Sequence, residues 1–169
     1  MNMTGTFEFE FKKFTGEKLP SVVDYVRDYY EKNKNIYIMV GTDSQGRGAK
    51  TVFSTIVAMY NYGDGEHGHG AHCIFRRWTT PRYRANQRAE RLLKEVEESL
   101  NVAHMLRDAG IPVKCVDIDI NPNPGDKQRN KSYEVYLAAK GWVEGEGFEC
   151  RYKTIAPLIT TLADWVVKN

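Results

Sequence analysis

The sequence predicts an α/β protein in which helices flank a mixed, five-stranded sheet, preceded by a short strand and helix. Two observations predict this class. Apolar, β-branched runs bounded by turn residues recur along the chain, and the order of patterns is three strands, then helix, strand, helix, strand, helix. With 169 residues, 41% of them hydrophobic, the chain is long enough to bury a core. We therefore expect a single domain over residues 1–169, with its core at 35–169.

Residues 1–34 are expected to form the strand–helix extension. Phe7–Phe11 alternates apolar and charged residues with period two, which predicts a half-buried strand. A turn signal at Thr15–Gly16 follows, and then apolar residues recur at helical spacing from Val22. Pro20 stands where the first turn of a helix tolerates proline, so a helix is expected from about this point.

Three consecutive antiparallel strands are expected to open the core. Ile36–Val40 is a continuous apolar run ended by Gly41, as is typical of a strand buried on both faces. The second strand is expected at Thr51–Tyr60 and the third at Ala71–Trp78, separated by a loop rich in glycine and histidine.

The longest helical pattern follows, from about Pro81 to Ala109, and ends at Gly110 and Pro112. On a helical projection, Glu95 is the glutamate expected to face the sheet, at the edge of the apolar stripe. The remaining elements are expected in this order: strand Val113–Ile120, helix Tyr133–Trp142, strand Phe148–Thr154 and helix Pro157–Lys168.

Composition excludes several classes of protein. No apolar run approaches the roughly 20 residues that cross a bilayer, and the charged start is unlike a signal peptide, so a cytoplasmic protein without membrane contact is expected. Cys73, Cys115 and Cys150 are far apart and lack metal-site spacing. We expect them to be buried thiols and not disulfides.

The net charge of +2 conceals a separation of charge. Six arginines and one glutamate fall between Arg76 and Arg91, and Lys127, Arg129 and Lys131 form a second basic segment, so the rest of the chain is net acidic. This distribution indicates a polyanionic partner. The alternative is a set of ordinary, solvated surface arginines.

Several carboxylates follow apolar strands or lie on apolar helix faces. Asp43 comes directly after a buried run, where it is either a turn residue or a paired or metal-bound group. Asp117 and Asp119 share one face of a central strand, and their mutual repulsion calls for a cation. Asp119 is the better candidate ligand, and Asp117 could pair with a basic neighbour. Asp164 lies among apolar residues of the last helix, where a solvated position is the ordinary alternative, as it is for Glu95.

The carboxylates follow one order: strand Asp, long-helix Glu, central-strand Asp, terminal-helix Asp. The stretches that carry this order are Val40-Gly-Thr-Asp-Ser-Gln45, Arg91-Leu-Leu-Lys-Glu-Val-Glu-Glu-Ser-Leu100, Asp117-Ile-Asp-Ile-Asn-Pro-Asn-Pro124 and Thr160-Thr-Leu-Ala-Asp164. Over nearly its whole length the chain resembles the ribonuclease H-like superfamily, and within it the YkuK-type RNase H-like family. One departure is Thr154-Ile155, where the family pattern has Pro-Asp, so that a fourth ligand would depend on Asp164 alone.

The resemblance implies an RNase H-like fold and a nuclease that hydrolyses phosphodiester bonds in RNA, DNA or a hybrid with two Mg²⁺ or Mn²⁺ ions. It implies that Asp43 bridges both ions, that Glu95 and Asp119 bind one and that Asp164 binds the other. Residues expected to support these ligands or contact substrate are Thr42, Ser44, Gln45, Asp117 and Asn121. Residues expected to hold phosphates are Arg82, Arg84, Arg88, Lys127, Arg129 and Lys131.

Other functions compete with this interpretation. The main alternative is a non-catalytic module that retains the fold and binds nucleic acid or protein. An actin-like ATPase needs two such domains, and 169 residues hold one. His67, His69 and His72 could form a transition-metal site, but solvent-exposed histidines are the ordinary expectation in such a loop. Trp78 and Tyr83 could stack on unpaired bases, although core packing is the ordinary role of Trp78.

Overall fold

The computed structural model of the chain describes residues 9–63, 70–122, 132–152 and 157–168. Their strands form one mixed sheet in the order β1-β4-β3-β2-β5-β6. In chain order the elements are β1 (Lys12–Lys13), α1 (Val22–Lys32), β2 (Ile36–Arg47), β3 (Lys50–Asn61), β4 (Ala71–Pro81), α2 (Arg88–Asp108), β5 (Val113–Ile118), α3 (Tyr133–Gly145), β6 (Glu149–Tyr152) and α4 (Pro157–Lys168). Pairing is antiparallel from β1 through β4 and β3 to β2, and parallel from β2 through β5 to β6.

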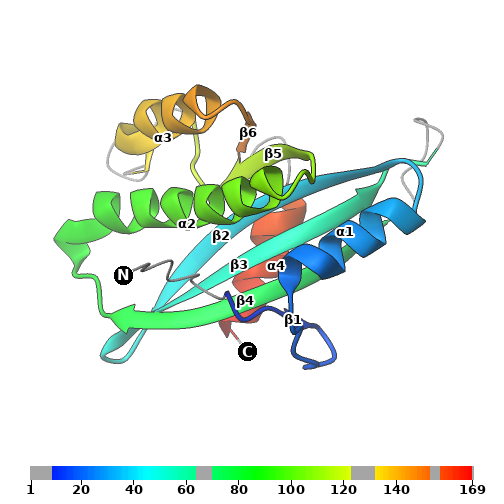
Figure 1. Cartoon of the computed structure of the whole chain (residues 1–169). Coiled ribbons are helices and arrows are strands. Elements are labelled where there is room, and N and C mark those ends of the chain that lie inside the picture. The colour runs from blue at the N-terminus through cyan, green and yellow to red at the C-terminus, as the bar shows by residue number, and fades with distance from the viewer. Residues whose placement is uncertain (1–8, 64–69, 123–131, 153–156, 169) are drawn as a thin grey trace, which may run out of the picture.

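The two faces of the sheet bury two separate clusters. Alternate residues of a strand point to opposite faces, so Ile38 and Val40 of β2 enter the larger cluster with α1, α2 and α3. Met39 points the other way, into a smaller cluster that α4 covers with Ala163 and Val166. Figure 1 shows α1 and α2 on one side of the sheet and α4 on the other. The predicted α/β class, with helices flanking a mixed sheet, is confirmed.

The amino-terminal extension differs from the prediction in one respect. The expected strand at Phe7–Phe11 is wrong within the described residues, because regular pairing starts only at Lys12, opposite Phe75. The Phe11 side chain is nevertheless fully buried in the larger cluster. The predicted helix is confirmed as α1, whose N-terminus is capped by Ser21 through a bond from the Asp24 amide.

The long helix also begins later than expected. β4 continues to Pro81, and a 3₁₀ turn at Ala85–Gln87 precedes α2, which starts at Arg88. Pro81 therefore ends a strand, and the residues between it and Arg88 connect β4 to α2.

The strand that carries Asp43 is longer than predicted. Gly41 does not end β2, because antiparallel pairing with β3 continues to Arg47 and places Asp43 opposite Ser54. Parallel pairing with β5, in contrast, stops at Gly41, opposite Asp117. Asp43 is thus a strand residue, and its assignment as a turn residue is wrong. It lies just beyond the point where β2 and β5 part.

Two further expectations can be compared with the structure. Cys73, Cys115 and Cys150 are free thiols, and burial raises the pKa of each, to about 11, 12 and 11 respectively. Among the described residues, no helix combines the length and apolar character needed to cross a membrane.

Candidate functional site

Asp43 of β2 and Asp119, the first residue after β5, both lie just beyond the point where the two strands diverge. The last pair of the parallel ladder joins Gly41 and Asp117, and two residues farther along each chain are Asp43 and Asp119. Both are half-buried. Asp43 Oδ1 accepts a hydrogen bond of 2.8 Å from the backbone N–H of Ser44. The carboxyl ends of these central strands therefore bring together the two strand aspartates that the sequence selected.

Glu95 joins them from α2. Its side chain is buried, and Ser44 Oγ donates a 2.5 Å hydrogen bond to Glu95 Oε1. Burial raises the pKa of Glu95 well above its ordinary value, and the negative charges of Asp43 and Asp119 raise it further. Arg91 and the Ser44 hydroxyl act in the opposite direction. We call Asp43, Glu95 and Asp119 the carboxylate cluster, because the charge of each strand aspartate acts on Glu95.

Arg91 is a member of this site that the sequence analysis missed. Its Nη1 donates to the carbonyl oxygen and to the hydroxyl of Ser44, at 2.7 Å each, and lies 3.4 Å from Glu95 Oε1. The sequence had grouped Arg91 with arginines that hold phosphates. The signal that could have separated it is its spacing from Glu95, since residues four apart lie on the same side of a helix. Arg91 supplies a positive charge to the carboxylate cluster.

Asp117 lies beside the cluster in an unfavourable environment. Only 2% of it is exposed, and within the described residues neither carboxylate oxygen has a hydrogen-bond partner. Burial raises its pKa to about 6, although the charge of Arg151, its neighbour in register on β6, lowers it. Arg151 is thus the basic neighbour of Asp117 that the sequence analysis allowed for. A buried carboxylate without hydrogen bonds is a costly feature that points to a functional demand.

Hydroxyl groups fix the helix to the strand beneath it. Ser99 Oγ donates to Thr42 Oγ1 at 2.8 Å and approaches the Glu95 carbonyl oxygen at 3.0 Å, while Thr42 and Thr55 hydroxyls lie 3.0 Å apart. Thr42 therefore supports the position of Glu95 by holding α2 to β2. Gln45 and Asn121, also predicted to support the site, are half-buried, the first on β2 and the second after β5.

The fourth predicted carboxylate cannot be placed with the others. Asp164 belongs to α4, but its side chain lies outside the described residues. Among the side chains that are described, no three Asp, Glu, His or Cys groups are arranged so that they could hold a metal ion. The donor chemistry nevertheless fits Mg²⁺ or Mn²⁺, which prefer carboxylate oxygens, and the buried Asp117 oxygens show that negative charge here is incompletely compensated.

The residues predicted to contact phosphates differ in their surroundings. Arg84 and Arg88 are exposed, just before α2 and at its first residue. Arg82 is exposed as well, but its Nη1 donates to the Gly48 carbonyl at 2.8 Å and so fastens the β2–β3 hairpin. Lys127, Arg129 and Lys131 lie outside the described residues. Arg84 and Arg88 are therefore the predicted contacts that remain accessible in the described part of the chain.

Glu98 corrects the helical projection of α2. The projection placed Glu98 farther from the apolar stripe than Glu95 and expected Glu95 alone to face the sheet, but Glu98 is 8% exposed and its Oε2 lies 3.2 Å from Arg76 Nη1 on β4. Lys94 Nζ lies 3.0 Å from its other oxygen. α2 therefore directs two glutamates, Glu95 and Glu98, toward the sheet.

Three other sequence hypotheses can be compared with the structure. Trp78 stacks on Phe53, with ring centroids 5.2 Å apart, and the Arg76 guanidinium lies 4.3 Å from its ring, so core packing is the better description. Tyr83 meets Phe53 edge-on. His72 is half-buried and not solvent-exposed, because its Nε2 is hydrogen-bonded to the Tyr25 hydroxyl at 2.7 Å. His67 and His69 lie outside the described residues.

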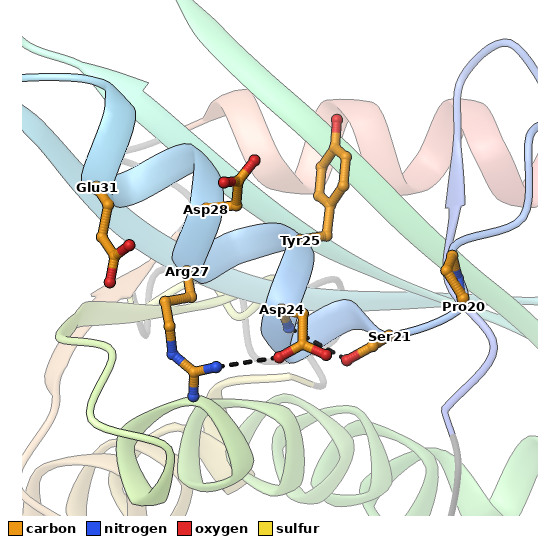
Figure 2. A pocket seen from close by; sticks show the side chains of 7 residues that line it. All are labelled: Pro20, Ser21, Asp24, Tyr25, Arg27, Asp28 and Glu31. Atoms are coloured by element: carbon orange, nitrogen blue, oxygen red, sulfur yellow. Dashed lines mark hydrogen bonds and ion pairs between the residues drawn. The ribbon is translucent and has the colours of Figure 1, made fainter.

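A separate hollow is lined by residues of α1 and of the turn before it, none of which belongs to the carboxylate cluster (Figure 2). Figure 2 shows its acidic lining, in which the Asp24 carboxylate pairs with Arg27 at 3.0 Å and the Asp24 backbone N–H donates to Ser21 Oγ. Asp28 and Glu31 extend this lining along the helix. The acidic side chains make the exposed side of α1 a poor surface for a polyanion.

Comparison with known proteins agrees with this arrangement. No protein with a curated description matches the sequence. A family model described as Ribonuclease H-like matches residues 21–168, which span α1 through α4 and contain all four predicted carboxylates. The mixed sheet flanked by helices agrees with this match, and because the match covers most of its length, the chain belongs to the Ribonuclease H-like family.

Proposed function

We propose that the protein is a divalent-metal-dependent nuclease that hydrolyses phosphodiester bonds in a nucleic acid. The observation that carries the proposal is that the negative charges of Asp43 and Asp119, near the ends of β2 and β5, act on the buried Glu95 of α2. Three carboxylates in a partly buried site repel one another, and a divalent cation would relieve that repulsion. The family match supports a role in nucleic-acid chemistry.

In this proposal Asp43, Glu95 and Asp119 would hold Mg²⁺ or Mn²⁺, with Asp164 as the fourth ligand and Asp43 shared between two ions. Bound ions would supply Lewis-acid chemistry and an activated water for in-line attack on the phosphodiester. The chain itself orients the ligands. Ser44 uses its N–H to hold Asp43 and its hydroxyl to hold Glu95, so one residue fixes two ligands from different elements.

Arg91 has a defined part in this proposal. Arg91 contacts Ser44 and Glu95, and its positive charge offsets part of the negative charge of Glu95 that a bound metal ion would offset. A metal ion bound at Glu95 would compete with the Arg91 guanidinium for the negative charge of that carboxylate. Arg84 and Arg88, exposed at the start of α2, would hold backbone phosphates without reading the bases.

The test is cleavage by the purified protein with Mg²⁺ or Mn²⁺, using hybrid, duplex, single-stranded and branched substrates. We expect cleavage of at least one substrate, its loss in EDTA, and its loss in Asp43→Asn. The matched control is Asp24→Asn, which changes an exposed aspartate on α1 and should leave cleavage intact. Absence of cleavage on every substrate, together with absence of metal-dependent heat in calorimetry, would overturn the proposal.

A second candidate function is a binding module without catalysis. The observation that favours it is the Arg91–Glu95 contact, which already places a cation against one of the proposed ligands. A module of this kind would keep its affinity for nucleic acid when Asp43 and Asp119 are both changed to Asn, and removal of the two negative charges would even strengthen binding. Metal-dependent cleavage that disappears in the same double variant excludes this alternative.

A further inference from the structure

Three aromatic side chains from distant segments meet at the outer edge of the sheet. Phe14 follows β1, Phe75 lies on β4, and Trp165 lies on α4. The ring centroid of Phe14 is 5.1 Å from that of Phe75 and 5.8 Å from that of Trp165. Phe14 is 39% exposed and Trp165 is 54% exposed, whereas Phe75 packs partly into the smaller core cluster. We call these three residues the edge aromatic patch.

Positive side chains lie next to this patch. Lys12 is opposite Phe75 in the antiparallel register, and Arg77 lies two residues farther along β4, so all three side chains share one face of the sheet. Lys12, Phe75 and Arg77 also line one hollow at the β4 edge. The Arg77 side chain is exposed, although its Nη2 lies 3.4 Å from the Val167 carbonyl, and Lys12 lies 3.5 Å from Glu10. Exposed rings beside cations are the arrangement that binds bases and phosphates of single strands.

The size of the patch favours a small occupant. From the exposed fractions of Phe14 and Trp165, their accessible area is about 200 Å², taking 150–250 Å² for a whole aromatic side chain. A stable protein–protein interface needs roughly 800 Å² from each partner. The patch is therefore too small to carry such an interface and has the dimensions of one or two stacked bases.

The patch lies on the same face of the sheet as Asp43. Arg77 pairs with Ser54, and Ser54 pairs with Asp43, so Arg77 and Asp43 are two strands apart on that face. At the usual strand spacing this separation is about 10 Å. α4 packs over β2 and β3 on this face and contacts Arg77 through the Val167 carbonyl, so a strand of nucleic acid that contacts both the edge aromatic patch and the carboxylate cluster has to pass around the end of α4.

We propose that the edge aromatic patch is a base-stacking site for unpaired nucleotides, and that the substrate of the protein contains a single-stranded segment. The choice of nucleic acid as substrate rests on the proposed function, but stacking at the patch requires neither metal nor cleavage. Trp78, the tryptophan that the sequence suggested for stacking, is packed between Phe53 and Arg76. Trp165 and Phe14 take that role here.

The test is the affinity of the full-length protein for a fluorescently labelled oligothymidine in EDTA. Base–aromatic stacking contributes about 1–3 kcal/mol per base, so we expect Phe14→Ala/Trp165→Ala to weaken binding by roughly tenfold to a hundredfold. Leu137→Ala is the matched control, because Leu137 is a 69% exposed apolar residue on α3 and its loss should leave affinity unchanged. Binding of a blunt duplex of equal length should be the same in all three proteins.

A second measurement covers the case in which the double variant fails to fold. In the wild type, oligothymidine should quench tryptophan emission, and Trp165→Phe should remove most of that quenching while retaining a ring at the position. Unchanged oligothymidine affinity in the folded double variant, or equal losses for single strand and duplex, would overturn the proposal. Loss of self-association in the double variant, with oligothymidine affinity retained, would assign the patch to contact between copies and also overturn it.

The two proposals can fail separately. If the wild type binds oligothymidine through the patch but cleaves nothing, the nuclease proposal fails and the stacking site stands. If the wild type cleaves nucleic acid and the double variant binds oligothymidine normally, the stacking site fails alone.

Discussion

Two buried glutamates on α2, three residues apart, have opposite electrostatic environments. Glu98 lies 3.2 Å from Arg76 and 3.0 Å from Lys94, so two cations surround one carboxylate. Glu95 lies 3.4 Å from Arg91, and the charges of Asp43 and Asp119 act against it. Burial is similar, with 4% of Glu95 and 8% of Glu98 exposed. Burial alone therefore does not distinguish the two carboxylates, whereas the balance of charge around each one does.

We therefore give Glu95 and Glu98 different roles. The Glu98–Arg76 pair connects α2 to β4 and satisfies both groups, which is a structural role. The carboxylate cluster concentrates negative charge that folding alone does not require. Such a cluster costs stability, and it is retained where a bound cation or a reaction uses it.

The sharpest test of this comparison is catalysis in Glu95→Gln and Glu98→Gln. Metal-ion catalysis contributes several kcal/mol to transition-state stabilisation, so Glu95→Gln should lower the rate of metal-dependent cleavage by about a thousandfold. Glu98→Gln is the matched control and should change the rate by less than about threefold. Equal losses in both variants, measured at a temperature where both are folded, would contradict the assigned roles.

The second test concerns pH, because the buried Asp117 carboxylate has no hydrogen-bond partner among the described residues, whereas Glu98 contacts two cations. The pKa of Asp117 is raised to about 6 in the folded protein, from 3.8. As pH rises, the Asp117 carboxyl therefore loses its proton in the unfolded state before it does so in the folded state. The free energy of unfolding falls as pH rises between these two pKa values. The loss attributable to Asp117 is about 3 kcal/mol, at 1.36 kcal/mol per pKa unit.

Urea denaturation between pH 4 and pH 7, in EDTA, measures this effect. Asp117→Asn lacks the titrating group, so its advantage over the wild type should grow from pH 4 to pH 6 and then level off. Arg151 and Glu149, whose charges act on Asp117, are present in both proteins. Parallel stability curves for variant and wild type would show that the Asp117 carboxylate does not titrate in this range.

The sequence predicted the positions of some of these carboxylates and not of others, and individual residues show why. Periodicity placed Glu95 at the edge of the apolar stripe, and strand order placed Asp43 beside Asp119, because both follow from local pattern and topology. Glu98 was misplaced because its burial depends on Arg76, a residue of β4 whose approach to α2 is a tertiary contact. Helical projection contains no information about such a partner.

The arginines show the same limit. The sequence treated them as one basic segment, but Arg76 pairs with Glu98, Arg82 holds the β2–β3 hairpin, and Arg91 contacts Glu95. The partner of each arginine is a carboxylate or carbonyl group that comes close to it only in the folded chain. The edge aromatic patch was missed for this reason as well, since Phe14 and Trp165 are 151 positions apart in a chain of 169 residues.

A third test measures the structural role of Glu98. Glu98→Gln removes the charge that faces Arg76 and Lys94, and hydrogen bonds to charged groups contribute about 1.5–3 kcal/mol, so the free energy of unfolding should fall by about 2 kcal/mol at pH 7. Glu95→Gln should leave stability unchanged or raise it, because it removes repulsion from Asp43 and Asp119. Urea denaturation of both variants in EDTA gives the two values. A larger loss in Glu95→Gln than in Glu98→Gln would reverse the comparison.

The smallest expected effect is stabilisation by metal, and it separates the two glutamates without requiring a substrate. A cation that binds the folded state alone stabilises it by RT ln(1 + [L]/Kd), or about 1.4 kcal/mol when Mg²⁺ or Mn²⁺ is present at ten times its Kd. The melting temperature of the wild type and of Glu98→Gln should rise by equal amounts on addition of either ion, and EDTA should reverse the rise. Asp43→Asn and Glu95→Gln should show no rise, because each removes a proposed ligand. A rise of the same size in Glu95→Gln would mean that the metal binds elsewhere, and the unbalanced charge around Glu95 would then need a different explanation.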